Sequence, residues 1–229
     1  MRSKQPVLAL VLVAVGATTS AQPPAAIEGV YTATRDGVHY TWILVDGYAS
    51  RTAYTDTSFL TTEGGPFTFA DDQMEVNVEF NSAKPDEVGR KQSHQWRPHA
   101  DGTMQVDGMD WRRELRPQDL DGAWHITAHT KDGKLEPIRH SGTRKTLKLL
   151  KDGWFQWFAI DPGKQAFHAT GGGRYTFRDG RYTEEILFFS RDNSRVGAKL
   201  QFTGELQDGA WHHSGKSSKG DPLYEVWER

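Results

Sequence analysis

The chain is one sequence unit written twice, and this repeat limits its fold more than any other feature. The landmarks of the two copies stay in step: Gly29-Val30-Tyr31 matches Gly122-Ala123-Trp124, Asp46-Gly47-Tyr48 matches Asp152-Gly153-Trp154, residues 65–69 match 173–177, and residues 88–91 match 196–199. Both copies also close on Trp and Arg, at Trp111 to Arg113 and at Trp227 to Arg229. We therefore predict two domains of the same fold, at residues 22–116 and 117–229.

The second copy shows the pattern of antiparallel β-strands. Residues 197–206 alternate between apolar side chains and polar ones, which is typical of a strand with one buried face. Asp-Gly or Gly-Asp pairs recur at strand-length intervals and predict hairpin turns, at Asp132-Gly133, Asp152-Gly153, Asp179-Gly180, Asp208-Gly209 and Gly220-Asp221. No long stretch has the apolar stripe of a helix. About eight strands per copy favour an up-and-down barrel, because closure removes exposed edges. The predicted fold is all-β, with two tandem antiparallel barrels.

The N-terminus has the features of a secretory signal peptide. Arg2 and Lys4 precede an apolar stretch at residues 7–16, and small residues lead to a cleavage site after Ala21. The apolar stretch is shorter than the roughly twenty residues that a membrane-spanning helix needs, so we expect no membrane span after residues 1–21 are removed. The protein is then periplasmic or secreted. Because the chain has no cysteine, it has neither a disulfide framework nor the residue that a bacterial lipid anchor requires.

Composition and charge narrow the classes of partner. Aromatic residues make up 11% of the chain, which supplies large buried surfaces for two small cores. The formal net charge is -2, and no stripe of Lys and Arg runs along the sequence. Nucleic acid is therefore not an expected partner, because nothing would neutralise its phosphates.

Several motifs of the second copy resemble lipocalin-like (calycin) barrels. These motifs are Gly122-x-Trp124 on the first strand, Tyr182-Thr183-Glu184, Trp211-His212-x-Ser214-Gly215, and a last strand that ends in Arg229. The nearest likeness is to lipocalin-like domains of uncharacterised exported bacterial proteins, and it implies a fold without an established activity. It also implies that Gly122, Trp124 and Arg229 are structural, with Arg229 stacked on the Trp124 ring at the closed end. The first copy departs from the pattern, with Tyr31, Val76 and Met109 at the positions of Trp124, Glu184 and Glu225.

Glu184 is the main candidate for chemistry. It alternates with Tyr182, Ile186 and Phe188, so we expect it to point into the barrel, where a carboxylate must be paired or protonated. Arg229 is the partner that the sequence suggests, and Glu225 extends this to a Glu-Arg-Glu cluster if the strands bring it inside. Such a cluster is either a structural ion pair or a polar patch that orients a ligand or acts as a general acid or base.

The remaining polar residues give weaker signals. His212 and His213 are neighbours on a strand, so only one of them faces inward, and the two cannot bind one metal ion together. The other histidines lack metal-binding spacing, and we expect neither a metal nor a cofactor. No Gly-x-Ser-x-Gly motif is present, and a thiol nucleophile is excluded by the absence of cysteine. The glycine run at residues 171–173 opens no helix and predicts a tight turn or a β-bulge.

One strand carries aromatic residues on both faces, at Trp154, Phe155, Trp157 and Phe158. One face fills a core, and the other predicts packing between the two copies before a ligand platform or a partner surface.

The sequence favours a binding protein for a small apolar or amphipathic molecule over two alternatives. The residues expected to line the site are Tyr182, Glu184, Trp211, His212, Glu225 and Trp227. The first alternative is an interaction module for an envelope protein or a glycan. The second is an isomerase or dehydratase that uses Glu184, His212 and Arg229. The sequence leaves open whether the barrels are filled or hollow, and that property separates these functions.

Overall fold

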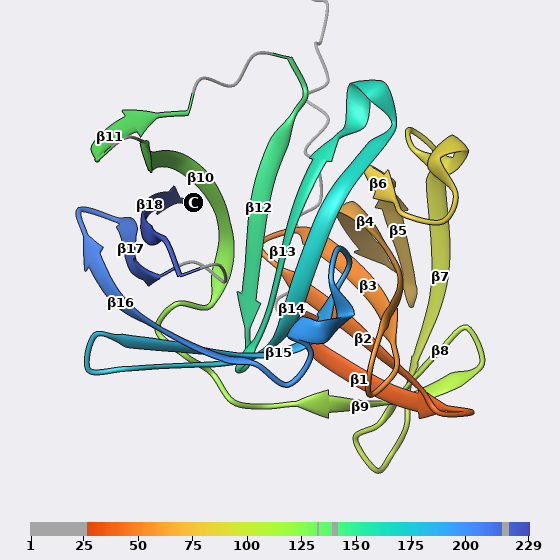
Figure 1. Cartoon of the computed structure of the whole chain (residues 1–229). Helices are drawn as coiled ribbons and strands as arrows, with labels where there is room; N and C mark the ends of the chain where they lie inside the picture. The colour runs from red at the N-terminus through yellow and green to blue at the C-terminus, as the bar shows by residue number, and fades with distance from the viewer. Residues whose placement is uncertain (1–26, 132, 139–141, 217–219) are drawn as a thin grey trace, which may run out of the picture.

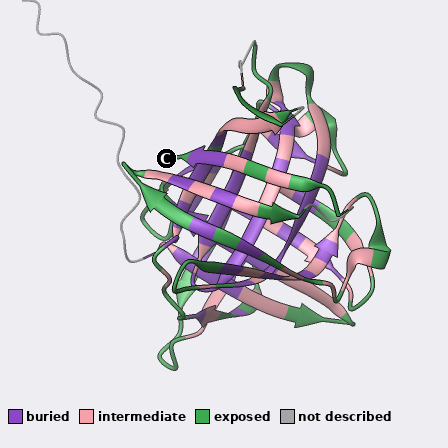
Figure 2. Cartoon of the chain, turned by 60° about the vertical axis from the view of Figure 1, so that its left-hand side comes forward, coloured by how far each residue is buried: buried purple, intermediate pink, exposed green. Residues whose placement is uncertain are grey.

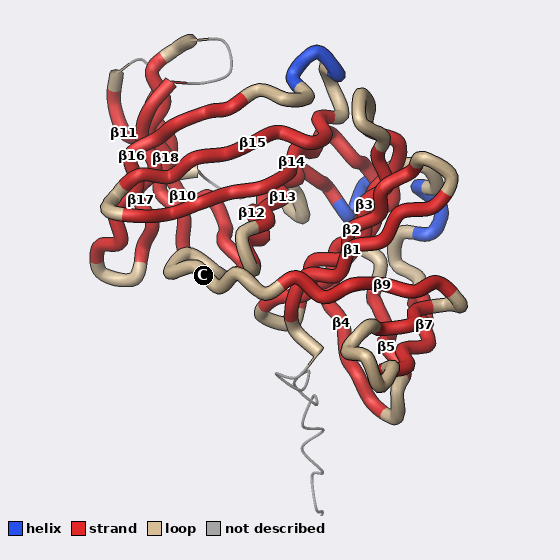
Figure 3. Tube along the Cα trace, turned by 90° about the horizontal axis from the view of Figure 1, so that it is seen from below, coloured by secondary structure: helices blue, strands red, loops and turns tan. Residues whose placement is uncertain are grey.

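The structure, a computed structural model, describes residues 27–131, 133–138, 142–216 and 220–229; the candidate signal peptide at 1–21 lies outside them. Most of the described chain is β-strand, and the short helical turns η1 (Pro85–Glu87), η2 (Pro162–Lys164) and η3 (Asn193–Arg195) lie in loops (Figure 3). No helix in these ranges is long and apolar enough to span a membrane. The all-β expectation is confirmed.

The first half of the chain forms a closed antiparallel barrel, which we call barrel 1. Its strands are β1 (Gly29–Arg35), β2 (Val38–Val45), β3 (Tyr48–Tyr54), β4 (Phe59–Ala70), β5 (Gln73–Asn77), β6 (Phe80–Asn81), β7 (Lys91–Pro98), β8 (Met104–Val106) and β9 (Met109–Glu114). The order β3-β2-β1-β9-β8-β7-β5-β4 is up-and-down, and pairing of β3 with β4 closes it. The short β6 is an extra strand on β4.

The second half forms barrel 2 with the same order. Its strands are β10 (Gly122–Lys131), β11 (Lys134–Pro137), β12 (Lys145–Lys151), β13 (Trp154–Asp161), β14 (Ala166–Arg178), β15 (Arg181–Phe189), β16 (Lys199–Gln207), β17 (Ala210–Lys216) and β18 (Pro222–Glu228). The ring runs β10-β12-β13-β14-β15-β16-β17-β18 and closes between β10 and β18, while β11 extends β10 as a hairpin. Figure 1 shows the barrels side by side, with β12 to β14 between them. The prediction of two tandem eight-strand barrels is confirmed.

Hairpins form at the predicted pairs Asp152-Gly153, Asp179-Gly180 and Asp208-Gly209, whereas Asp132 of another predicted pair lies outside the described residues. Asp152, Asp179 and Asp208 each have φ near +50°, and the glycine that follows each also has positive φ. Two successive positive φ values are typical of the two-residue turns that match the twist of a hairpin. The tight turns therefore fix strand lengths, and along the strands buried and more exposed residues alternate (Figure 2).

The same device closes one end of each barrel. The Arg229 guanidinium lies 4.6 Å from the centre of the Trp124 ring and donates a 2.7 Å hydrogen bond to the carbonyl of Asp121. In barrel 1, Arg113 lies 5.8 Å from the Tyr31 ring. A Cβ at Gly122 would come within 2.7 Å of Nε of Arg229, so a larger residue there would displace the stacked guanidinium. The predicted stacking of Arg229 on Trp124 is confirmed.

An apolar interface joins the two barrels. A single buried cluster takes Ile43, Val45 and Phe80 from barrel 1 and residues such as Trp154 and Phe158 from barrel 2. The Phe158 ring packs 4.5 Å from that of Phe80 and stacks on Tyr48 at 5.7 Å between centroids. Packing between the two copies is therefore confirmed for the second aromatic face of β13.

A polar group lies within this apolar interface. The side-chain carbonyl of Gln156 accepts hydrogen bonds from Ser50 and Thr52, and its amide donates to Thr62 at 2.9 Å and Thr170 at 3.1 Å. The two N–H groups of the Gln156 side chain and both acceptor positions of its oxygen are thus hydrogen-bonded to side chains from the two barrels, as burial of an amide requires.

The glycine run at residues 171–173 lies within β14, and the pairing of β14 with β15 shifts register between Gly172 and Gly173. A Cβ at Gly173 would lie 2.0 Å from the carbonyl oxygen of Glu185. Of the two predicted forms, the structure has a bulge within a strand rather than a turn.

Candidate functional site

Barrel 2 contains a cavity of about 400 Å³ at the end away from the Arg229 closure. Most of its wall is apolar or aromatic, and a few ionisable side chains interrupt it. The lining residues are Ile126, Thr146, Lys148, Trp157, Ala159, Glu184, Ile186, Phe189, Leu200, Phe202, His213, Leu223, Glu225 and Trp227. Barrel 2 is therefore hollow at one end, which the sequence left open.

Glu184 is buried in the wall of this cavity, as its alternation on β15 predicts. Its Oε1 accepts a hydrogen bond from the Lys148 ammonium at 3.0 Å and another from the Tyr182 hydroxyl at 2.9 Å. Burial and the neighbouring Glu184 charge raise the pKa of Tyr182 well above its usual range, so the hydroxyl remains a donor. Glu184 therefore belongs to a buried ion pair with a second, neutral donor.

Lys148 is surrounded by aromatic rings. Its ammonium lies 5.2 to 5.8 Å from the ring centres of Phe155, Tyr182, Trp211 and Trp227. Rings at this distance attract a cation, which offsets part of the loss of water. The neighbouring residues Leu147 and Leu149 face the apolar interface with barrel 1, so alternation on β12 turns Lys148 inward.

His213 and Glu225 form a second polar pair in the wall. Nδ1 of His213 lies 3.2 Å from Oε2 of Glu225, and this oxygen also accepts a 3.1 Å hydrogen bond from the Trp227 indole. Burial lowers the pKa of His213, and the Lys148 charge adds to this against the raising effect of Glu225. Burial acts to raise the pKa of Glu225, but the His213 hydrogen bond and the Lys148 charge outweigh it, so the pKa lies below its usual range.

His212 does not belong to the site, contrary to expectation. It lies on the outer face of β17, where its Nδ1 is 2.8 Å from the Tyr224 hydroxyl. Trp211 and His213 are buried inside the barrel on either side of it. Because side chains alternate along a strand, the histidine that shares the Trp211 face is the one that points inward.

The expected pairing of Glu184 with Arg229 is also wrong. Arg229 is held at the closed end over Trp124, whereas Glu225 faces the cavity at the other end, so no Glu-Arg-Glu cluster forms. The three residues proposed for an isomerase or dehydratase, Glu184, His212 and Arg229, are therefore not brought together.

Five of the six residues predicted to line a ligand site lie inside barrel 2. The rings of Tyr182 and Trp211 pack against the Lys148 ammonium, whereas Glu184, Glu225 and Trp227 line the cavity itself. Sequence reasoning missed Lys148 and His213. His213 could have been found from its place two residues after Trp211, which puts both side chains on the same face of the strand. Lys148 could have been found by aligning the two copies, because Lys148 and Glu184 are both replaced by apolar residues in the first copy.

The joint change is visible in the strand pairing. Lys148 pairs with Trp124 as Trp42 pairs with Tyr31, and Glu184 pairs with Tyr175 as Val76 pairs with Phe67. Barrel 1 thus has Trp42 and Val76 in place of the ion pair, and both are buried among Trp96 and Trp111. Apolar side chains thus fill barrel 1 at the two positions where barrel 2 has the ion pair.

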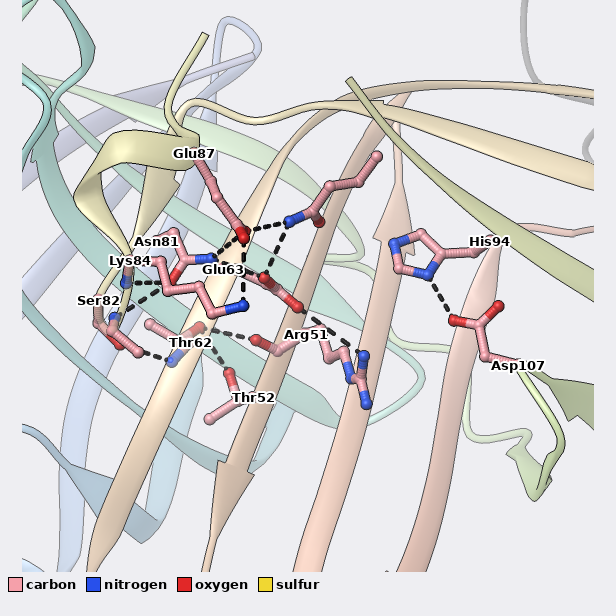
Figure 4. Close-up of polar contacts among 12 residues, drawn as sticks. Arg51, Thr52, Thr62, Glu63, Asn81, Ser82, Lys84, Glu87, His94 and Asp107 are labelled. Carbon is pink, nitrogen blue, oxygen red and sulfur yellow. Dashed lines mark hydrogen bonds and ion pairs between the residues drawn. The ribbon is translucent and has the colours of Figure 1, made fainter. Parts of the chain in front are cut away.

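Barrel 1 has a smaller cavity, of about 270 Å³, at the equivalent end, and a polar cluster occupies its rim (Figure 4). The Asn81 amide bridges Glu63 at 2.8 Å and Glu87 at 3.1 Å, and Gln92 donates to Glu87 at 2.7 Å. Arg51 lies 3.8 Å from Glu63. The carboxylates of this cluster are thus bonded to other side chains of the same barrel.

Figure 4 also shows His94 beside Asp107 in barrel 1, with Nδ1 of His94 2.6 Å from the Asp107 carboxylate. The histidine packs at 5.1 Å against the Trp42 ring. A larger hollow, of about 510 Å³, lies between the barrels, but its walls are mostly loops and strand ends such as Asn77, Gly89 and Gly163. Among the described residues, no group of three His, Asp or Glu side chains is placed to hold a metal ion.

Comparison with known proteins adds little to this geometry. No family model and no curated protein matches the chain. Among solved structures, the chain is similar to an uncharacterised protein from Bacteroides eggerthii, with 15% identity over 48% of this chain and 100% of that one. The TM-score is 0.34, so this likeness carries no argument about function.

Proposed function

We propose that barrel 2 binds one small amphipathic molecule, whose apolar part fills the cavity while its polar end meets Glu184, His213 and Glu225. The observation that carries this proposal is the mixed wall of the cavity. Ligand sites in proteins are concave and mostly apolar, with a few convergent polar groups, and commonly enclose about 300 to 1,000 Å³. The barrel 2 cavity combines these properties, at about 400 Å³.

The contrast between the two barrels supports the same assignment. A barrel that serves only as scaffold is best filled with apolar side chains, because a cavity and a buried ion pair both reduce stability. Barrel 1 follows that rule with Trp42 and Val76, whereas barrel 2 retains Lys148 and Glu184 beside a hollow interior. A binding role gives a reason for an arrangement that folding alone does not favour.

The proposal includes export of the protein. The charged start, the short apolar stretch and Ala21 favour removal of residues 1–21 and a periplasmic or secreted location, where the barrels would carry or capture their ligand. The lipocalin-like resemblance is compatible with such a role.

A blocking substitution tests the binding site. Ala159 lines the barrel 2 cavity, and its counterpart Ala53 lines the cavity of barrel 1. We expect Ala159→Phe to reduce the affinity for the neutral apolar probe N-phenyl-1-naphthylamine about tenfold or more, because the new ring takes the space of the ligand. Probe fluorescence measures binding, and circular dichroism verifies the fold.

Ala53→Phe is the matched control and should bind the probe as the unmodified protein does. Equal binding by all three proteins would place the probe elsewhere and refute the barrel 2 site. Loss of binding in Ala53→Phe alone would move the site to barrel 1.

A further inference from the structure

The cavity of barrel 2 presents acceptors of hydrogen bonds to whatever enters it. Glu184 uses Oε1 for Lys148 and Tyr182, and Glu225 uses Oε2 for His213 and Trp227. The second oxygen of each carboxylate has no hydrogen bond within the described chain. Neither oxygen is fully buried, so both remain accessible from the cavity. Both residues line the cavity, so these oxygens face an incoming ligand.

His213 holds the Glu225 carboxylate in place. A carboxylate only accepts hydrogen bonds, so Nδ1 of His213 must carry the proton that it shares with Glu225. In the neutral ring Nε2 is then a lone pair. This atom is buried, in a side chain that is 3% exposed, and it has no partner among the described residues. The ring therefore donates a hydrogen bond to Glu225 without adding a positive charge to the wall, and burial, the largest cause, lowers the pKa of His213.

The charges in the wall favour the same kind of ligand. Two carboxylates, Glu184 and Glu225, stand against a single ammonium, Lys148, and the remaining lining residues, with His213 in its neutral form, carry no charge. Lys148 is already paired with Glu184 at 3.0 Å and enclosed by rings. Its charge reaches Glu225 as well, but among the described residues Glu225 forms no ion pair with a lysine or an arginine. Trp157, Phe189 and Phe202 add aromatic surface, which also attracts cations.

We propose that the polar end of the ligand is a protonated amine, so that barrel 2 is a site for amphipathic ammonium compounds. The ammonium donates to Glu225 and Glu184, and the apolar chain lies against Leu200, Leu223 and Ile186. This inference rests on the proposed function, because it names the class of ligand for the same cavity. Barrel 1 does not offer such a site, because its carboxylates Glu63 and Glu87 are bonded to Asn81, Gln92 and nearby cations.

Three probes of equal chain length separate the head groups: octylammonium, 1-octanol and octanoate, measured by calorimetry at pH 7.5. We expect octylammonium to bind at least about tenfold more tightly than 1-octanol, and octanoate to bind most weakly, because the wall repels a carboxylate. Equal binding of all three would overturn the ammonium assignment and leave the proposed binding site intact. Tighter binding of octanoate would also overturn it. Failure of all three to bind would refute the proposed function itself.

Variants locate the interaction. Glu225→Gln should weaken octylammonium about tenfold and 1-octanol clearly less, because the charged head group loses an ionic contact whereas the hydroxyl loses only a hydrogen bond. Glu205→Gln is the control, since Glu205 is exposed on the outer face of β16. Unchanged octylammonium binding by Glu225→Gln would overturn the assignment. The probe series on the unmodified protein remains decisive if this variant does not fold.

Discussion

Lys148 and Glu184 are two buried charges whose counterparts in barrel 1, Trp42 and Val76, are both apolar. A buried ion pair contributes little net stability, because the loss of water nearly offsets the attraction, but removal of one partner leaves a charge without compensation. The two positions are therefore coupled, and each restricts what the other can be.

This coupling predicts the outcome of a double-mutant cycle. Lys148→Met should reduce the free energy of unfolding by about 3 to 5 kcal/mol, because Glu184 is then buried alone. The double variant Lys148→Met with Glu184→Leu should be more stable than Lys148→Met, since both charges are absent, as in barrel 1. Urea unfolding measures each value. A double variant that loses the sum of the two single effects would show that the positions are independent.

At the scale of elements, alternation along a strand explains what the sequence could predict and where it stopped. Alternation correctly predicted that Glu184 on β15 points inward, and the Asp-Gly pairs predicted the positions of hairpin turns. On β12, however, Leu147 and Leu149 pack against barrel 1 while Leu150 packs inside barrel 2, so both faces are buried and the pattern does not show where Lys148 points. To identify Lys148 as the partner of Glu184, one must know that Leu147 and Leu149 face barrel 1. The sequence of β12 by itself does not give that information.

Alternation on β17 also predicts a difference between two adjacent histidines. The pKa of His213 lies below its unfolded value, so as pH falls below about 6.5 the unfolded state binds a proton before the folded one does, and stability declines. Between pH 7.5 and 5.5 we expect the unmodified protein to lose more stability than His213→Gln, measured by urea unfolding. His212→Gln should keep the original slope, because His212 lies at the surface. Equal slopes for the unmodified protein and His213→Gln would contradict the assignment.

At the scale of the whole molecule, the interface makes the two barrels one folding unit. The apolar cluster and the Gln156 hydrogen bonds draw side chains from both halves, so neither barrel buries its contact face alone. Two units that share a core are expected to unfold together.

Phe158→Ala tests this unity. Phe158 is fully buried in the interface, and we expect the substitution to reduce the free energy of unfolding by about 3 to 5 kcal/mol while a single transition remains. Tryptophan fluorescence and far-ultraviolet circular dichroism should give the same urea midpoint. Leu206→Ala, at a side chain that is 46% exposed, should change stability by less than about 1 kcal/mol. Two separate transitions in Phe158→Ala would show that the barrels fold independently.

The tryptophan-rich core of barrel 1 has a consequence for how this protein tolerates mutation. A lone barrel with a cavity and buried charges would stand close to the stability below which most substitutions unfold it. Here Trp42, Trp96 and Trp111 stabilise barrel 1 by packing in its core, and the core cluster shared by the two barrels couples the stability of barrel 2 to that of barrel 1. The cavity wall can therefore drift in sequence, and its choice of ligand can diverge, while the chain still folds.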